Sequence, residues 1–177
     1  MDVFASRVLE GNQLAVFTDA TGLSSEEMQA LARETNLSET TFVLPREVEV
    51  EARDGVKVRI FTTAEELKFA GHPTLGTAWY LAASRGLDAV TLDLPVGKIP
   101  VEFRRENGKL VFGEMRQKDP VFGQIHDPEG VAKALGMEIS GLDPSVPVQT
   151  VSTGMPFAIV PVRSLETLQT FSLYWPK

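Results

Sequence analysis

The sequence contains no cysteine among its 177 residues and only two histidines, His72 and His126. The absence of cysteine excludes disulfides, thiolate metal sites and thiol catalysis. Two histidines far apart in the sequence, without cysteine, do not predict a zinc site. No apolar run approaches the roughly 20 residues that span a bilayer, and no basic segment leads into an apolar stretch after Met1. The cytoplasm is therefore the expected compartment, without a membrane partner.

Positive charge is also scarce. The chain has 17 Lys and Arg against 24 Asp and Glu, a formal net charge of −7. The closest approach to a basic run, Arg104–Arg105, is flanked by Glu102 and Glu106. Because nucleic-acid binding depends on clustered Lys and Arg, no nucleic-acid partner is expected. Hydrophobic residues make up 43% of the chain, enough to bury a core.

Two helices are indicated by their ends. Ser24 followed by Glu27 is a capping box, and the residues after it have helical spacing on one face up to Asn36. The second helix has Pro73 in its first turn and Gly86 as its stop, with residues 74–85 between. This second helix is apolar on nearly all sides, so we expect protein to surround it.

The remaining pattern predicts mostly strands. The expected ranges are 1–7, 14–17, 40–44, 47–52, 56–61, 90–94, 99–105, 110–115 and an interrupted strand over 149–162. Hairpin turns are expected at 53–55 and at Asn107-Gly108. A short helix over 129–135 begins after Asp127 and Pro128. Strands surrounding one buried helix predict an α+β fold, with a boundary that separates residues 1–117 from a partial second half, 118–177.

His72 and Glu39 are the candidate catalytic residues. His72 directly precedes the buried helix, where free backbone N–H groups and the helix dipole favour a small carboxylate, although a histidine here could simply cap the helix. Glu39 lies between a helix end and an apolar strand, where partial burial would suit it to accept and return a proton. The alternative for Glu39 is a solvated loop residue, and 24 acidic residues offer many such candidates.

Three segments together resemble the PhzF-like phenazine-biosynthesis isomerase family, whose fold is shared with diaminopimelate epimerase. They are Gly11-Asn12-Gln13-Leu14-Ala15-Val16-Phe17, Asn36-Leu37-Ser38-Glu39-Thr40-Thr41-Phe42 and Phe69-Ala70-Gly71-His72-Pro73-Thr74-Leu75-Gly76-Thr77-Ala78. Gln13 departs from the pattern, since the family usually has proline there.

The resemblance implies two barrel-like halves, each a curved sheet around a central helix, with the site in the cleft between them. It implies that Glu39 shuttles a proton and that His72 polarises or positions the substrate. Four neighbours, Ser38, Gly71, Pro73 and Thr74, would help to bind a small carboxylate. It further implies a hydrogen shift within a small cyclic or unsaturated acid, without cofactor or metal, in a homodimer.

Length is the main departure from the family. Its members run well beyond 177 residues, and a glycine-rich motif of their second half is missing here, so the chain resembles a shortened member. Two hypotheses follow. In the first, the chain is an isomerase, whose site a second chain could complete. In the second, it is a catalytically incomplete remnant that binds small carboxylates or acts as a dimerising module.

Overall fold

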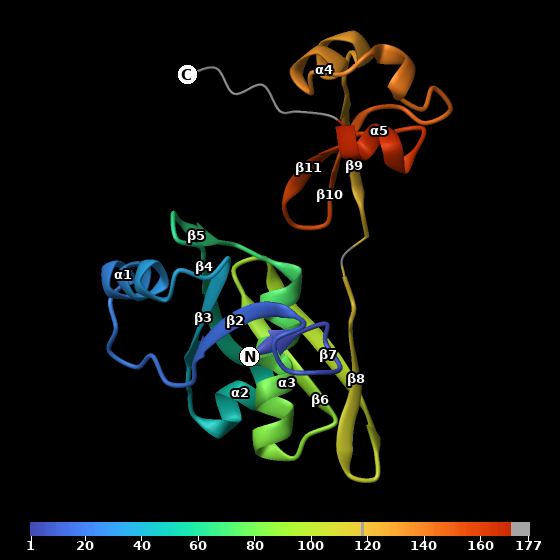
Figure 1. Ribbon diagram of the computed structural model, residues 1–177. Helices are drawn as coiled ribbons and strands as arrows, with labels where there is room; N and C mark the ends of the chain where they lie inside the picture. Colours follow the sequence, from blue (N-terminus) through green and yellow to red (C-terminus); the bar gives the residue numbers. More distant parts are fainter. Residues whose placement is uncertain (118, 171–177) are drawn as a thin grey trace. The chain divides into compact units, whose positions relative to one another are not determined.

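The computed structural model describes residues 1–117 and 119–170. The chain divides into two compact units, residues 1–117 and residues 118–177 (Figure 1). Residues 118 and 171–177 of the predicted second half lie outside the described residues. Within the described ranges, no helix combines the length and hydropathy that crossing a membrane requires.

The first unit is built on one curved sheet of eight strands. In the sheet they follow the order β1-β2-β3-β4-β6-β7-β8, and β5 pairs with β4. The strands are β1 (Asp2–Val3), β2 (Asn12–Phe17), β3 (Glu39–Leu44), β4 (Val56–Phe61), β5 (Glu66–Leu67), β6 (Ala89–Leu94), β7 (Gly97–Glu106) and β8 (Lys109–Met115). Most neighbours are antiparallel, but β2 with β3 and β4 with β6 are parallel.

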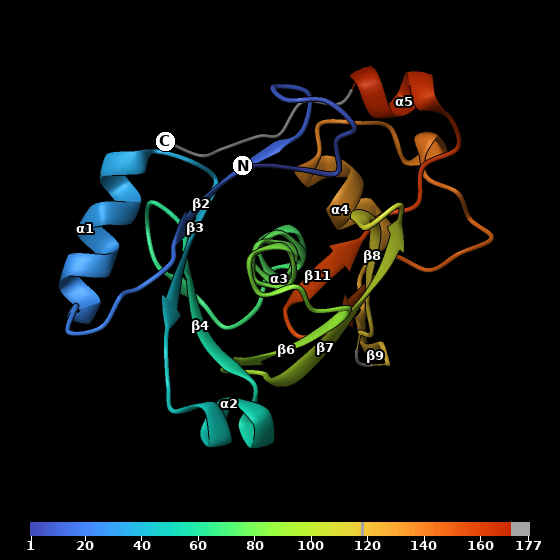
Figure 2. The ribbon, with the colours of Figure 1, turned by 90° about the horizontal axis from the view of Figure 1, so that it is seen from below.

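Each parallel pair requires a crossover, and each crossover contains a helix. Helix α1 (Ser25–Thr35) connects β2 to β3, and α3 (Gly71–Arg85) lies between β4 and β6 in the chain. The capping box at Ser24 and Glu27 is present, and Asn36 adopts the left-handed conformation that ends α1. Figure 2 looks along α3 and shows the strands curving around it, with α1 on the outer side of β3. The predicted central helix is therefore confirmed.

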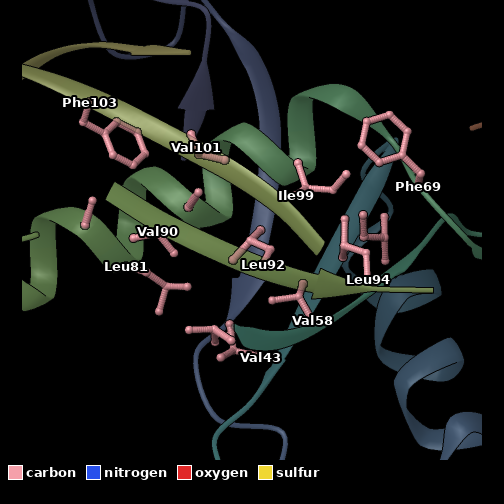
Figure 3. Close-up of a cluster of buried hydrophobic side chains, with 14 residues drawn as sticks. Val43, Val58, Phe69, Leu81, Val90, Leu92, Leu94, Ile99, Val101 and Phe103 are labelled. Carbon is pink, nitrogen blue, oxygen red and sulfur yellow. The ribbon is translucent and has the colours of Figure 1, made fainter. Parts of the chain in front are cut away.

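The main core lies between α3 and the concave side of the sheet. Figure 3 shows side chains from β3, β4, β6 and β7 gathered around α3, including Val58, Leu92 and Val101, which are all buried. A smaller cluster lies between α1 and the sheet, where Phe42 stacks on Phe17 at a ring distance of 4.8 Å. Because β3 contributes to both clusters, Thr40 to Val43 are all buried.

The segment after β3 differs from expectation. The alternation over 47–52 predicts a strand, but residues Val48–Asp54 form a helix, α2. Alternation was misleading because Glu, Ala and Arg are good helix formers, and no core lies beneath this segment: α2 has no buried residue. Its Glu51 instead bonds outward, accepting from the guanidinium of Arg85 at the end of α3.

Two other strands differ from the predicted ranges. The first strand covers only Asp2–Val3, and the short β5 was not predicted. Asn107 and Gly108 both have positive φ, as a two-residue hairpin turn requires.

The second unit holds a three-stranded antiparallel sheet in the order β11-β10-β9. Its elements are β9 (Val121–Ile125), α4 (Pro128–Ala134), the 3-10 helix η1 (Ile139–Gly141), β10 (Gln149–Ser152), β11 (Pro156–Ile159) and α5 (Leu165–Thr170). The interrupted strand predicted over 149–162 is the pair β10 and β11, and β9 was missed. Asp127 caps α4 by accepting from the N–H of Gly130.

Candidate active site

Glu39 and His72 lie together in the first unit. Glu39 is the first residue of β3, and His72 is the second residue of α3. The Glu39 Oε2 atom lies 3.4 Å from His72 Nδ1, and the two side chains are 19% and 8% exposed. Among the described residues, Oε2 has no hydrogen-bond partner although it is buried. The distance is longer than a good hydrogen bond.

The other ring nitrogen of His72 determines how the pair shares protons. His72 Nε2 lies 3.3 Å from the backbone carbonyl oxygen of Gln13 in β2. A carbonyl oxygen only accepts, so Nε2 carries the hydrogen in this contact. A neutral His72 therefore turns the lone pair of Nδ1 towards Glu39. Two acceptors at this distance are compatible when one proton lies between them, on the carboxyl of Glu39 or on Nδ1.

The first turn of α3 supplies donors beside this pair. Ala70, at the N-cap, is extended, and its side chain makes no capping hydrogen bond. The N–H of Thr74 donates to Ala70 O, and Pro73 has no N–H. The amides of Gly71 and His72 therefore represent the open end of this helix, where the positive end of the dipole favours an anion.

The other predicted binding residues take different places in the structure. Ser38 is exposed and directly precedes Glu39, whereas Pro73 and Thr74 are buried in the first turn of α3. The Thr74 hydroxyl donates to Ala70 O at 2.6 Å, within its own helix. Thr74 thus contributes to the shape of the helix start, and the polar groups near the surface are those of Ser38, Gly71 and His72.

Sequence reasoning missed two contributors. The carbonyl of Gln13 orients His72, but a backbone group leaves no signature in the sequence. Met115, at the end of β8, lies beside the helix start: a Cβ atom added to Gly71 would come within 3.4 Å of its methyl group. Met115 also packs against the main core cluster.

A cavity of about 430 Å³ lies beside α3, lined by residues 1–6, by Leu75, Gly76 and Trp79 of α3 and by Val111–Gly113. Neither Glu39 nor His72 lines this cavity. This cavity therefore does not mark the carboxylate–imidazole pair, which is distinguished by its chemistry.

A sequence model of the family described as phenazine biosynthesis-like protein matches residues 1–175. The chain belongs to this family. The family resemblance of the three motifs is thereby confirmed.

Curated relatives of this phenazine biosynthesis-like chain include isomerases. It is 40% identical over 168 residues to the trans-2,3-dihydro-3-hydroxyanthranilate isomerase of Pseudomonas aeruginosa, and 41% identical over 169 residues to that of Pseudomonas chlororaphis. Each match covers 95% of this chain and 58% of the relative. The chain thus spans less than two thirds of the length of these relatives.

Solved structures agree on the fold of this family member. A protein described as a predicted epimerase from Pseudomonas aeruginosa superposes with a TM-score of 0.85 at 37% identity, covering 98% of this chain and 61% of that one. A PhzF family protein from Bacillus anthracis gives 0.78 at 34% identity, covering 97% and 57%. A hydroxyproline epimerase from Agrobacterium vitis gives 0.56 at 9% identity, over 82% and 42%, a likeness of fold alone. The predicted epimerase-like α+β fold is confirmed.

Proposed function

We propose that this chain provides the proton-transfer centre of an isomerase that shifts a hydrogen within a small cyclic or unsaturated carboxylic acid. One observation carries the proposal: a buried, unpartnered oxygen of Glu39 lies 3.4 Å from His72 Nδ1, beside the uncapped start of α3. The names of the curated relatives support the reaction class, and suggest a dihydro-hydroxyanthranilate as the substrate to test first.

In the proposed reaction the Glu39 carboxylate removes a proton from one carbon of the substrate, and the electron pair of the broken C–H bond delocalises into the unsaturated acid. The carboxylic acid formed on Glu39 then returns the proton to another carbon, so substrate and product have the same composition. The substrate carboxylate would accept from the amides of Gly71 and His72. His72, held through Nε2 by Gln13, orients the Glu39 carboxylate and carries its own proton on Nδ1 while Glu39 acts as the base.

The test is Glu39→Gln, which keeps the size of the side chain and removes the base. Turnover of trans-2,3-dihydro-3-hydroxyanthranilate would be followed by NMR in D₂O, and the rate is expected to fall by about 10²–10⁴-fold, the usual contribution of a general base. Glu34→Gln, an exposed acid on α1, is the matched control and should keep the wild-type rate. Wild-type turnover in Glu39→Gln would refute the role of Glu39.

The second candidate is binding of a small carboxylate without turnover. It is favoured by the one set of donors that the described site offers, the amides at the start of α3. An oxyanion donor contributes about 10²–10³-fold to rate, so one set can bind an acid without turning it over efficiently. A wild-type chain that lacks turnover, but whose His72 ring signals shift with added 2-aminobenzoate, would support this candidate over the isomerase.

We also infer that the chain forms a homodimer. In support, apolar side chains are exposed around the free edges of the sheet, with Phe4, Val8 and Leu9 at 71%, 82% and 87% and Phe112 at 51%. Exposed apolar patches of this kind usually mark interaction sites. Sedimentation velocity at micromolar concentration is expected to show a dimer, and a monomer would count against the inference.

A further inference from the structure

Three elements meet at the Glu39–His72 pair, and a second set of polar contacts joins the same three elements deeper in the unit. The hydroxyl of Thr77 in α3 donates to the hydroxyl of Thr41 in β3 at 2.8 Å. The hydroxyl of Thr41 donates in turn to the carbonyl oxygen of Ala15 in β2, at 3.4 Å. Thr41 and Thr77 are both fully buried.

The two sets of contacts have comparable spacing along their elements. Thr41 and Ala15 each lie two residues beyond their counterparts at the site, Glu39 and Gln13, which is about 6.6 Å along a strand. Thr77 lies five residues beyond His72, about 7.5 Å along the helix and about 140° around it. The hydroxyl contacts therefore join the same helix and the same two strands as the site, from a different side of α3.

Buried hydroxyl groups are costly to leave unpaired, so a fully bonded pair holds its two elements at a defined separation. The Glu39–His72 contact depends on the same separation, because one partner is on β3 and the other on α3. We propose that Thr77 and Thr41 are positioning residues, whose hydroxyl bond sets the distance between the Glu39 carboxyl and the His72 ring. The inference rests on the proposed function of that pair.

The experiment measures the contact itself, without requiring turnover. Long-range ¹H–¹⁵N spectra of the full chain report the Nδ1 and Nε2 signals of His72, and Glu39→Gln should change the Nδ1 signal in the wild-type background. In the Thr77→Val background, the change that Glu39→Gln causes in the Nδ1 signal is expected to fall to less than half of its wild-type size. The reason is that the Glu39 carboxyl and the His72 ring are no longer held together. Thr77→Ser retains the hydroxyl and should restore the wild-type response.

Thr40→Val is the matched control. Thr40 is the next residue of β3 after Glu39, is equally buried, and shares a 2.8 Å hydroxyl–hydroxyl contact with Thr35 of α1 instead of α3. Thr40→Val should therefore lose stability as Thr77→Val does. In the Thr40→Val background, however, Glu39→Gln should change the His72 Nδ1 signal as much as it does in the wild type. Where turnover is present, Thr77→Val should lower kcat by up to about 100-fold, the effect of a misplaced catalytic group.

The outcomes separate the two proposals. If Glu39→Gln leaves the Nδ1 signal unchanged in the wild-type background, the Glu39–His72 contact is absent in solution and the proposed function fails. If the wild-type responds but Thr77→Val responds equally, the contact exists without help from the hydroxyl pair and only the positioning inference is overturned. An equal loss in Thr40→Val and Thr77→Val would also overturn it, since general loosening would then explain both.

Discussion

Gly55 is a glycine whose replacement should strongly disturb the first unit. It ends α2 directly before β4, and its backbone has φ 89° and ψ 173°, a conformation nearly confined to glycine. A Cβ atom at this position would lie 2.7 Å from the carbonyl oxygen of Thr91 in β6. Gly55→Ala therefore combines a strained backbone with a clash against another backbone, which cannot turn aside as a side-chain end can.

The two costs can be estimated separately. A residue forced into this region costs about 1–3 kcal/mol, and an overpacked contact costs about 1–3 kcal/mol more. Gly86, the C-cap of α3, has φ 68° and ψ 31°, and apart from its chain neighbours no atom of the described residues lies within 4 Å of an added Cβ. Gly86→Ala should cost only the left-handed strain, about 1–2 kcal/mol. Gly55→Ala should thus cost about 2–6 kcal/mol, more than Gly86→Ala.

Thermal and urea denaturation followed by near-ultraviolet circular dichroism would compare the two variants. Trp79 reports on the first unit, because its ring packs edge-on against Phe103 at 5.8 Å. Each kcal/mol lowers Tm by about 2–8 °C in domains near this size. If Gly55→Ala were no less stable than Gly86→Ala, the close approach of β4 and β6 at Thr91 would not limit the fold as argued.

Two further predictions concern stability. Hydrogen bonds from Arg53, and to a smaller extent from Lys98, lower the pKa of the Asp54 carboxyl from 3.8 to about 2. Because the pKa of the Asp54 carboxyl is lower in the folded state, it contributes stability that is present above pH 3.8 and lost as pH falls through about 2. Asp54→Asn should therefore be less stable than the wild type in urea at pH 5, and equally stable below pH 2. Phe42→Ala should lose about 3–5 kcal/mol of unfolding free energy in urea titrations, because Phe42 is fully buried between aromatic neighbours. A loss below about 1 kcal/mol would contradict that packing.

Elements with local signals were predictable from the sequence. The Ser24–Glu27 capping box marked α1, and the lack of a polar face marked α3 as enclosed. Asn107-Gly108 marked the hairpin between β7 and β8. The segment that became α2 was not predictable by alternation, because charged residues at every second position fit an exposed helix as well as a strand.

The site was predictable only in part, for a different reason. His72 could be singled out by its place before a helix, but Glu39 is one of 24 acidic residues, and only the family resemblance distinguished it. The parallel pairing of β2 with β3 brings Gln13 and Glu39 to the same end of the sheet, and that pairing depends on the whole crossover through α1. The Thr41–Thr77 bond likewise joins residues 36 positions apart and carries no local signal.

The geometry of His72 restricts how the proposed site can tighten around a substrate. Its two nitrogens face Glu39 at 3.4 Å and the Gln13 carbonyl at 3.3 Å, and both contacts are longer than a good hydrogen bond. Since the two nitrogens lie on different edges of one rigid ring, a shift of the ring along one contact draws it away from the partner in the other. Rotation of the Glu39 carboxyl can shorten its contact with Nδ1 without disturbing the contact with Gln13, within the space that the separation of α3 from β3 allows. In the proposed mechanism, the bonded Thr41–Thr77 pair that holds this separation bears directly on proton transfer, although it is more deeply buried than Glu39 and His72.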